Sequence, residues 1–253
     1  MIFLLGLVVG SFLNCIIYRL ETRENFLKGR SYCPHCKHIL SWKDLIPIFS
    51  FLFLKGKCRY CQKKISLQYP LVEFFTGFLF LAISLSKGLF SIESIFLWIL
   101  ASCLIIIFVF DLKHLLIPDS VIHFAIFMVL IYRWFRIWNF GNWNLFEVQN
   151  LIFAVLPSLF FLAIILISKE TWMGFGDFKL SILMGLLLGW PKILIAIFFA
   201  FFLGGIGGLL LVILKKKTMK SQIPFAPFLI FGTLLSAIFG ERIINLYLDL
   251  FLI

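Results

Sequence analysis

Long apolar runs separated by short polar segments make up most of this chain. Runs of roughly 17–25 apolar residues can cross a bilayer as helices, and about eight occur here. They cover residues 2–20, 70–86, 90–110, 120–136, 150–168, 178–191, 192–214 and 223–240. The sixth run is short and meets the seventh at Gly189-Trp190-Pro191, a turn signal. The pattern predicts an all-α polytopic membrane protein with about eight transmembrane helices.

Two segments fall outside this pattern. Residues 21–69 form a polar loop that contains cysteines, and residues 243–253 are apolar but too short to span, so we expect them at the membrane interface. We divide the chain into residues 1–86, with spans one and two and the loop, and residues 87–253, with spans three to eight. The first run lacks a basic region before it and precedes Arg19, which favours a retained helix over a signal peptide.

Composition supports lipid as the main solvent. Of 253 residues, 62% are hydrophobic and 14% are charged, and the mean hydropathy is +1.07. Soluble domains are nearer half apolar and a quarter charged. The formal net charge of +11 does not indicate nucleic-acid binding, because the cations gather in a few loops between apolar runs.

Those basic loops predict the orientation. Ten cations follow the first span: Arg23, Lys28, Arg30, Lys37, Lys43, Lys55, Lys57, Arg59, Lys63 and Lys64. Four follow the seventh: Lys215, Lys216, Lys217 and Lys220. The opposite loops hold only Lys87, Arg133, Arg136 and Lys192. With eight spans both basic loops lie on one side, which the positive-inside rule makes cytoplasmic, and the N-terminus lies outside.

Four cysteines in the first loop form two CxxC pairs, Cys33 with Cys36 and Cys58 with Cys61. Two intervening residues let both thiolates of a pair reach one tetrahedral metal, and two pairs complete a closed four-sulfur site. A cytoplasmic loop is reducing, which disfavours disulfides. We predict a structural zinc site, with a redox dithiol pair or metal-free cysteines as the alternative.

Carboxylates at membrane depth are costly and are therefore candidates for function. Asp111 ends the third run, and Asp119 follows Pro118 at the start of the fourth. Asp177 follows Gly174-Phe175-Gly176, whose glycines permit a tight bend and a close approach to a neighbour. Asp177 and Asp119 are also suited to be helix caps. Glu73, in the second run, has no partner that the sequence reveals.

Two neighbouring aspartates suit peptide hydrolysis because they share one proton. The ionised carboxylate takes a proton from water, which attacks the carbonyl that the protonated carboxyl polarises. Membrane aspartates also relay ions, so a proton-coupled transporter is the alternative. A scaffold whose cysteine loop binds a partner is a third interpretation. The absence of an HExxH motif argues against a zinc protease.

The motifs together resemble those of the bacterial prepilin leader peptidases, a family of GxGD intramembrane aspartic peptidases. Gly10-Ser11-Phe12-Leu13-Asn14 with Arg19-Leu20 is similar to the family's opening signature. The CPxC…CxxC loop, an aspartate before Ile-Pro-Asp, and GxGD then follow in family order. Three shorter stretches are also similar to the family: residues 44–47, 69–73 and 223–225. Two departures, Glu21 for a common proline and Ala226 for the usual glycine, do not touch the aspartates.

This resemblance implies cleavage of precursors of type IV pilins and type II secretion pseudopilins at the cytoplasmic face of the bacterial inner membrane. It implies Asp111 and Asp177 as the catalytic pair, with Asp119 as the alternative first member. Many members also methylate the new amino terminus with S-adenosylmethionine, an activity linked to the region of the cysteine loop. No glycine-rich nucleotide fingerprint assigns that activity to particular residues. The expected partners are precursor proteins and lipid, not nucleic acid.

Overall fold

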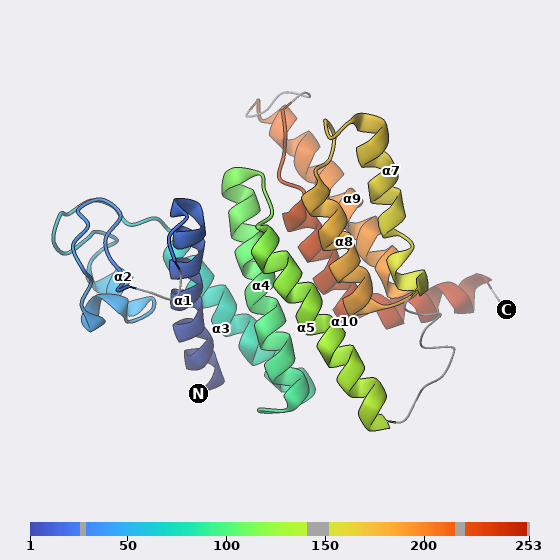
Figure 1. The fold of residues 1–253 in the computed structure, drawn as a ribbon, viewed down its shortest axis with the longest axis horizontal. Coiled ribbons are helices and arrows are strands. Elements are labelled where there is room, and N and C mark those ends of the chain that lie inside the picture. The colour runs from blue at the N-terminus through green and yellow to red at the C-terminus, as the bar shows by residue number, and fades with distance from the viewer. Residues whose placement is uncertain (26–28, 141–151, 216–220, 252–253) are drawn as a thin grey trace. The chain divides into compact units, whose positions relative to one another are not determined.

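The computed structural model describes residues 1–25, 29–140, 152–215 and 221–251 and is almost wholly helical in these ranges (Figure 1). The chain divides into two compact units, Met1–Ile106 and Ile107–Ile253. The first unit contains α1 (Ile2–Thr22), the 3-10 helix η1 (Trp42–Leu45), α2 (Phe49–Phe53), α3 (Gln68–Lys87) and most of α4 (Ile92–His114). The second contains the end of α4 and five further helices: α5 (Asp119–Phe140), α7 (Ser158–Ser168), α8 (Phe175–Leu188), α9 (Lys192–Ile213) and α10 (Ala226–Phe251).

Each predicted apolar run corresponds to helix in the described residues. Residues 152–155 form a short helical stretch, and Pro157 precedes α7, so the fifth run is broken; its first residues, 150 and 151, lie outside the described part. Lys28, Lys216, Lys217 and Lys220 also lie outside it. Gly189 ends α8 with a φ of 75°, a left-handed value that suits glycine, which confirms the predicted turn before α9.

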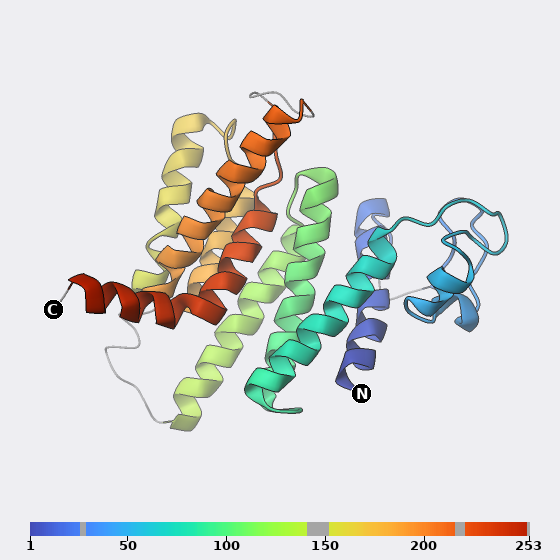
Figure 2. The ribbon, with the colours of Figure 1, turned by 180° about the vertical axis from the view of Figure 1, so that it is seen from behind.

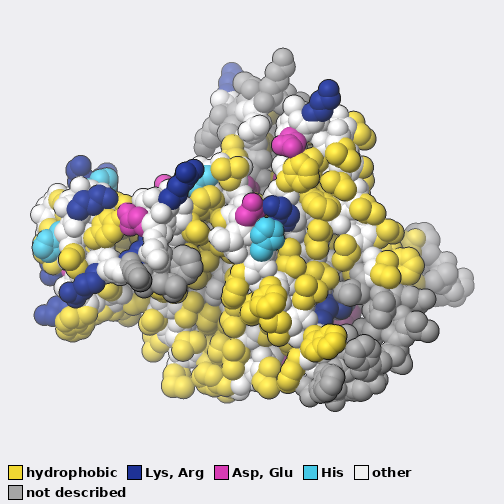
Figure 3. All heavy atoms as spheres, in the orientation of Figure 1, with side chains coloured by type: hydrophobic (Ala, Val, Ile, Leu, Met, Phe, Trp, Pro, Cys, Tyr) yellow, Lys and Arg dark blue, Asp and Glu magenta, His cyan; other side chains and the backbone are white. Residues whose placement is uncertain are grey.

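Five helices are long and apolar enough to cross a membrane: α1, α3, α4, α9 and α10. The stretch Ile152–Ser168 is apolar but shorter, and α8 has 14 residues. Hydrophobic side chains cover much of the exposed surface of the helices (Figure 3). Such a surface is typical of helices that are surrounded by lipid rather than water. The chain is therefore a multi-pass membrane protein, while the count of eight spans stays a prediction.

In the first unit, α1 and α3 pack with their backbones in close approach. A Cβ on Gly6 would lie 2.6 Å from the Cα of Gly77, and one on Gly10 would lie 2.7 Å from the Cα of Glu73. One turn further along α1, the buried Asn14 donates a hydrogen bond from Nδ2 to the carbonyl oxygen of Tyr69 at 3.0 Å. The opening signature therefore joins the first two long helices.

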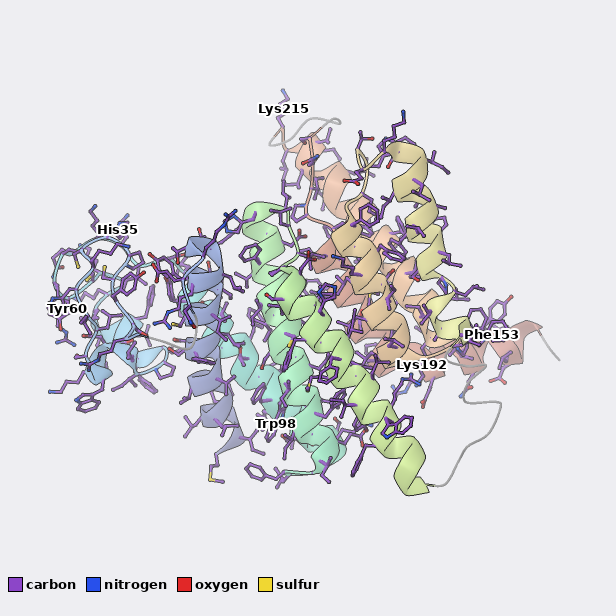
Figure 4. The ribbon with its side chains drawn as sticks, viewed as in Figure 1. His35, Tyr60, Trp98, Phe153, Lys192 and Lys215 are labelled. Carbon is purple, nitrogen blue, oxygen red and sulfur yellow. The ribbon has the colours of Figure 1, made fainter. Side chains whose placement is uncertain are left out.

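An aromatic stack joins α3 to α4 in the same unit. Trp98, labelled in Figure 4, stacks on Phe80 with ring centroids 5.1 Å apart and donates its indole N–H to the Phe80 carbonyl oxygen at 3.1 Å. Ile2 of α1 completes this core. The buried indole thus has its polar group satisfied, as a tryptophan in an apolar interior requires.

The second unit is arranged around the short helix α8. This helix contacts α5, α7, α9 and α10, and α9 packs along α10. The last turns of α10 run at a steep angle to its first part (Figure 2). Residues 243–251 therefore continue a helix, and their predicted place at the membrane interface stays a prediction.

Candidate metal centre and aspartate pair

The cysteine loop is built from two hairpins with the same hydrogen bonds, 25 positions apart. In the first, Cys33 N–H donates to the His38 carbonyl, and in the second, Cys58 N–H donates to the Lys63 carbonyl. The bridges Tyr32 with Ile39 and Lys57 with Lys64 repeat with the same offset. The residue after each second cysteine, Lys37 or Gln62, has a φ of 58°, so each chain turns back in the same way.

This repeat brings four sulfur atoms together. The Sγ atoms of Cys33, Cys36, Cys58 and Cys61 all lie within 4.8 Å of one another, and Cys33 and Cys61 are 3.9 Å apart. Zinc–sulfur bonds of about 2.3 Å in a tetrahedron place the sulfurs about 3.8 Å apart. The spacing fits a four-thiolate metal site, and all four cysteines are free thiols rather than disulfides.

The sulfurs differ in how readily they ionise. Burial opposes ionisation of Cys33, but hydrogen bonds from backbone groups of Cys36 and His35 outweigh it and lower the pKa to about 7. The backbone of Lys63 favours ionised Cys61, yet burial and the three adjacent sulfurs raise its pKa to about 11. One thiolate therefore forms near neutral pH, whereas a full set of four needs a cation to offset their repulsion.

Buried polar side chains tie this loop to α1 and α3. The guanidinium of Arg19, at the end of α1, donates to the carbonyl oxygens of Asn25 and Gly29, the latter at 3.0 Å. Glu73 of α3, which had no partner from sequence, accepts the N–H of Ile48 on its Oε2 at 2.7 Å. These contacts give the Arg19 and Glu73 positions a structural role that spacing along the sequence did not reveal.

Within the loop itself, the buried side chain of Asp44 contacts residues of two segments. Its carboxylate accepts hydrogen bonds from Ser41 and, at 2.7 Å, from Arg59. Burial raises the pKa of Asp44, but these hydrogen bonds exceed that effect and hold it below its usual range. An ionised Asp44 thus joins η1 to the second cysteine hairpin.

Asp111 lies in the last turn of α4 and is 5% exposed. Its Oδ2 accepts the backbone N–H of Ala226 at 3.1 Å. Ala226 is the first residue of α10, and a helix N-terminus leaves N–H groups without intrahelical partners. The start of α10 therefore orients the Asp111 carboxylate, a contact across 115 positions of chain that no local motif reveals.

Asp177 lies in the first turn of α8, where Gly174 is the N-cap. Its carboxylate accepts a hydrogen bond from the Gly174 backbone and lies close enough to Asp111 for the two charges to repel. A Cβ on Gly176 would lie 2.9 Å from the Cβ of Ile117, which confirms the predicted close approach at this glycine. Gly174 has no such neighbour, so only one of the two glycines is required by packing.

Asp119, the alternative first aspartate, has different surroundings. It begins α5, its side chain is 66% exposed, and it pairs with Lys179 of α8 at 2.6 Å. This ion pair joins the segment after Asp111 to the helix that carries Asp177. The two candidates therefore differ in environment: Asp111 is buried, whereas Asp119 is exposed and paired with a lysine of α8.

Comparisons with known proteins bear on both sites. The family model described as "Bacterial Peptidase A24 N-terminal domain" matches residues 4–86, and "Type IV leader peptidase family" matches residues 98–209. A prepilin leader peptidase/N-methyltransferase of Bacillus subtilis (strain 168) is 33% identical over 249 residues, which cover 98% of this chain and 97% of the relative. Two proteins of the same name are also similar. The one from Aeromonas hydrophila is 31% identical over 100% of this chain and 94% of the relative, and the one from Legionella pneumophila is 33% identical over 97% of this chain and 92% of the relative. No solved structure matches the chain.

Proposed function

Because the chain belongs to the type IV leader peptidase family, we propose that it is a membrane aspartic endopeptidase that removes the leader peptides of type IV prepilins and type II secretion pseudopilins. The observation that carries the chemistry is the proximity of the Asp111 and Asp177 carboxylates at adjoining helix ends. Family membership does not support the proton-coupled transporter that the sequence left open. The scaffold interpretation has no support from it either.

In this proposal, the two aspartates share a proton and work on one water molecule. The ionised carboxylate accepts a proton from the water, which attacks the scissile carbonyl, and the protonated carboxyl donates to the carbonyl oxygen. The Ala226 N–H fixes the orientation of Asp111, and the packing of Gly176 on Ile117 fixes the start of α8. Asp119 is less suited because it is exposed and already paired with Lys179.

The cysteine cluster fits zinc, with Cys33, Cys36, Cys58 and Cys61 as ligands. Four thiolates leave no open coordination position, so the metal would hold the loop together rather than activate water. We also propose N-methylation of the new amino terminus, for which S-adenosylmethionine supplies the methyl group. The proposed location is the bacterial inner membrane, with the N-terminus outside and the cysteine loop in the cytoplasm.

Cleavage of a prepilin by the full chain in membranes tests the catalytic pair. We expect Asp111→Asn and Asp177→Asn each to lower the cleavage rate at least about 100-fold, because each removes a proton-transfer group. Asp119→Asn is the matched control and should retain cleavage within about fivefold, as expected for an exposed ion pair.

Equal abundance of the variants in the membrane separates lost chemistry from lost folding. Wild-type cleavage by the Asp111→Asn variant, with loss in Asp119→Asn, would transfer the catalytic role to Asp119. Failure of the wild type to cut any prepilin or pseudopilin would overturn the peptidase assignment.

A further inference from the structure

The cysteine loop carries an apolar surface that no part of the described chain covers. It consists of four exposed side chains on η1 and α2, which we call the α2 patch: Trp42, Phe49, Leu52 and Phe53. Trp42 is 71% exposed and Phe53 is 84% exposed. Because η1 and α2 contact one another, these residues form one surface. Clustered exposed aromatic and aliphatic residues mark an interaction site.

One contact and the arrangement of the helices set the height of this patch relative to α1 and α3. The Ile48 N–H, directly before α2, is bound to Glu73, which lies five residues into α3 from Gln68. At about 1.5 Å per residue, this is about 7.5 Å along the helix from its start. Figures 1 and 2 agree that α2 lies at a height between the two ends of α1 rather than beyond the end from which the loop leaves.

That height corresponds to the boundary layer of a bilayer. Both α1 and α3 are long and apolar enough to cross a membrane. A surface held about 7.5 Å below a helix start lies where interfacial helices bury their apolar faces, about 5–10 Å into the headgroup and acyl boundary. If α3 enters the bilayer at its first residue, a surface held at this depth would have lipid, not water, as its neighbour.

The charges around the patch favour a negatively charged lipid surface. Lys43, Lys55 and Lys57 are exposed on the segments that flank α2, and the Nζ of Lys43 lies 5.6 Å from the centre of the Trp42 ring. The acidic residue of this segment, Asp44, is buried and paired with Arg59. Aromatic residues beside lysines are typical of segments that bind the interface of anionic membranes.

We propose that the α2 patch is a lipid-docking surface, which inserts into the interfacial layer of the membrane that α1 and α3 span. The flanking lysines would bind anionic headgroups, so the loop would be held at the bilayer surface at three places: its two ends and α2. This proposal is independent of the peptidase chemistry. The other candidate occupant is the apolar helix of a precursor protein, and the experiment distinguishes the two.

Photocrosslinking on the full chain tests the proposal. The protein with Phe53→p-benzoylphenylalanine is reconstituted in vesicles of phosphatidylglycerol and phosphatidylcholine, irradiated, and analysed by mass spectrometry. The control is His35→p-benzoylphenylalanine, since His35 is exposed on the part of the loop away from α2 (Figure 4). We expect phospholipid adducts at position 53 and none at position 35, with equal metal content in both proteins.

Removing charge provides a second arm. In vesicles that contain phosphatidylglycerol, Lys43→Gln and Lys55→Gln should each lower the adduct yield at position 53, by up to about fivefold. Neither substitution should change the adduct yield in vesicles of pure phosphatidylcholine, which have no net negative charge. Equal adduct yields at positions 53 and 35, or none at 53, would overturn the proposal. So would a crosslink at position 53 that moves from lipid to an added precursor, because the patch would then bind protein.

Discussion

In the cysteine loop, hydrogen bonds within eight residues of chain shape each cysteine pair. The surroundings of Asp111 and Asp177 instead depend on contacts between distant helices, because Asp111 accepts the N–H of Ala226 at the start of α10, and α8 packs on α10. The first arrangement gathers four groups that repel one another once ionised and so depends on a cation. The second depends on a helix start and a close-packed glycine. The two sites should therefore fail under different treatments, even though one chain carries both.

Removal of the metal should separate the behaviour of the two sites most clearly. Cys58→Ser leaves three sulfur ligands, so we expect the bound zinc of the purified protein to fall to below about one tenth of the wild-type amount. Protease cleavage within residues 29–67 should become faster. Prepilin cleavage should fall less than it does in the aspartate variants, because Asp111 and Asp177 lie in the other compact unit.

Cys15→Ser is the control, since Cys15 lies in α1 outside the cluster. Lowering the pH should reduce the bound zinc, as Cys58→Ser does. Cys33 is a thiolate above its pKa of about 7, so zinc affinity should weaken as the pH falls through 7 and protons compete for sulfur. Full zinc content in the Cys58→Ser protein would show that the cluster is not a four-sulfur site.

Substitution of the two glycines beside Asp177 tests how far the aspartate site depends on close packing. Gly176→Ala places a methyl group against Ile117, and overpacking of this kind costs about 1–3 kcal/mol. We expect prepilin cleavage to fall about tenfold or more, measured at equal protein abundance. Gly174→Ala should change it by less than about threefold, because a Cβ there meets no side chain.

Helix propensity makes this pair of variants more informative. Alanine favours a helix over glycine by about 1 kcal/mol, so a loss in Gly176→Ala cannot come from a weakened helix. Equal activity of the two variants would mean that Ile117 moves aside without effect on Asp177.

The smallest effect is expected at the exposed ion pair. Lys179→Gln removes the partner of Asp119, and exposed pairs contribute about 0.2–1 kcal/mol. Cleavage should therefore fall by about fivefold or less at low salt, and the difference from wild type should shrink in high salt, which screens exposed charges. A tenfold loss that persists in high salt would instead place Lys179 in direct contact with the reacting groups.

The sequence predicted the helices and the clustering of the four cysteines well, because both depend on local patterns. It was less accurate at helix ends. The third run ends at residue 110 by hydropathy, yet α4 continues to His114, and α10 continues past Glu241 and Arg242 to Phe251. Charged residues interrupt an apolar run without interrupting a helix, since hydropathy reports burial and not backbone conformation. At Glu241, the charge is paired with Lys192 at 2.6 Å.

Contacts between distant segments could not be predicted from one sequence. Nothing near Asp111 indicates the N–H of Ala226, nothing near Glu73 indicates Ile48, and Gly176 gives no sign that its neighbour is Ile117. Each depends on how helices pack in three dimensions. The exposed α2 patch was likewise not apparent, because residues 42–53 belong to a loop that is polar and basic as a whole.

The length of α8 has a consequence for the bilayer itself. Its 14 residues extend about 21 Å, whereas the hydrocarbon core is about 30 Å thick. The chain returns from the end of α7 before α8 begins, so α8 starts below that end in Figure 1. As one of the predicted spans, a helix this short would require local thinning of the bilayer around it. Such thinning would bring bulk water close to Asp177. Water is a reactant in hydrolysis, and it would otherwise have to cross the hydrocarbon core to reach this site.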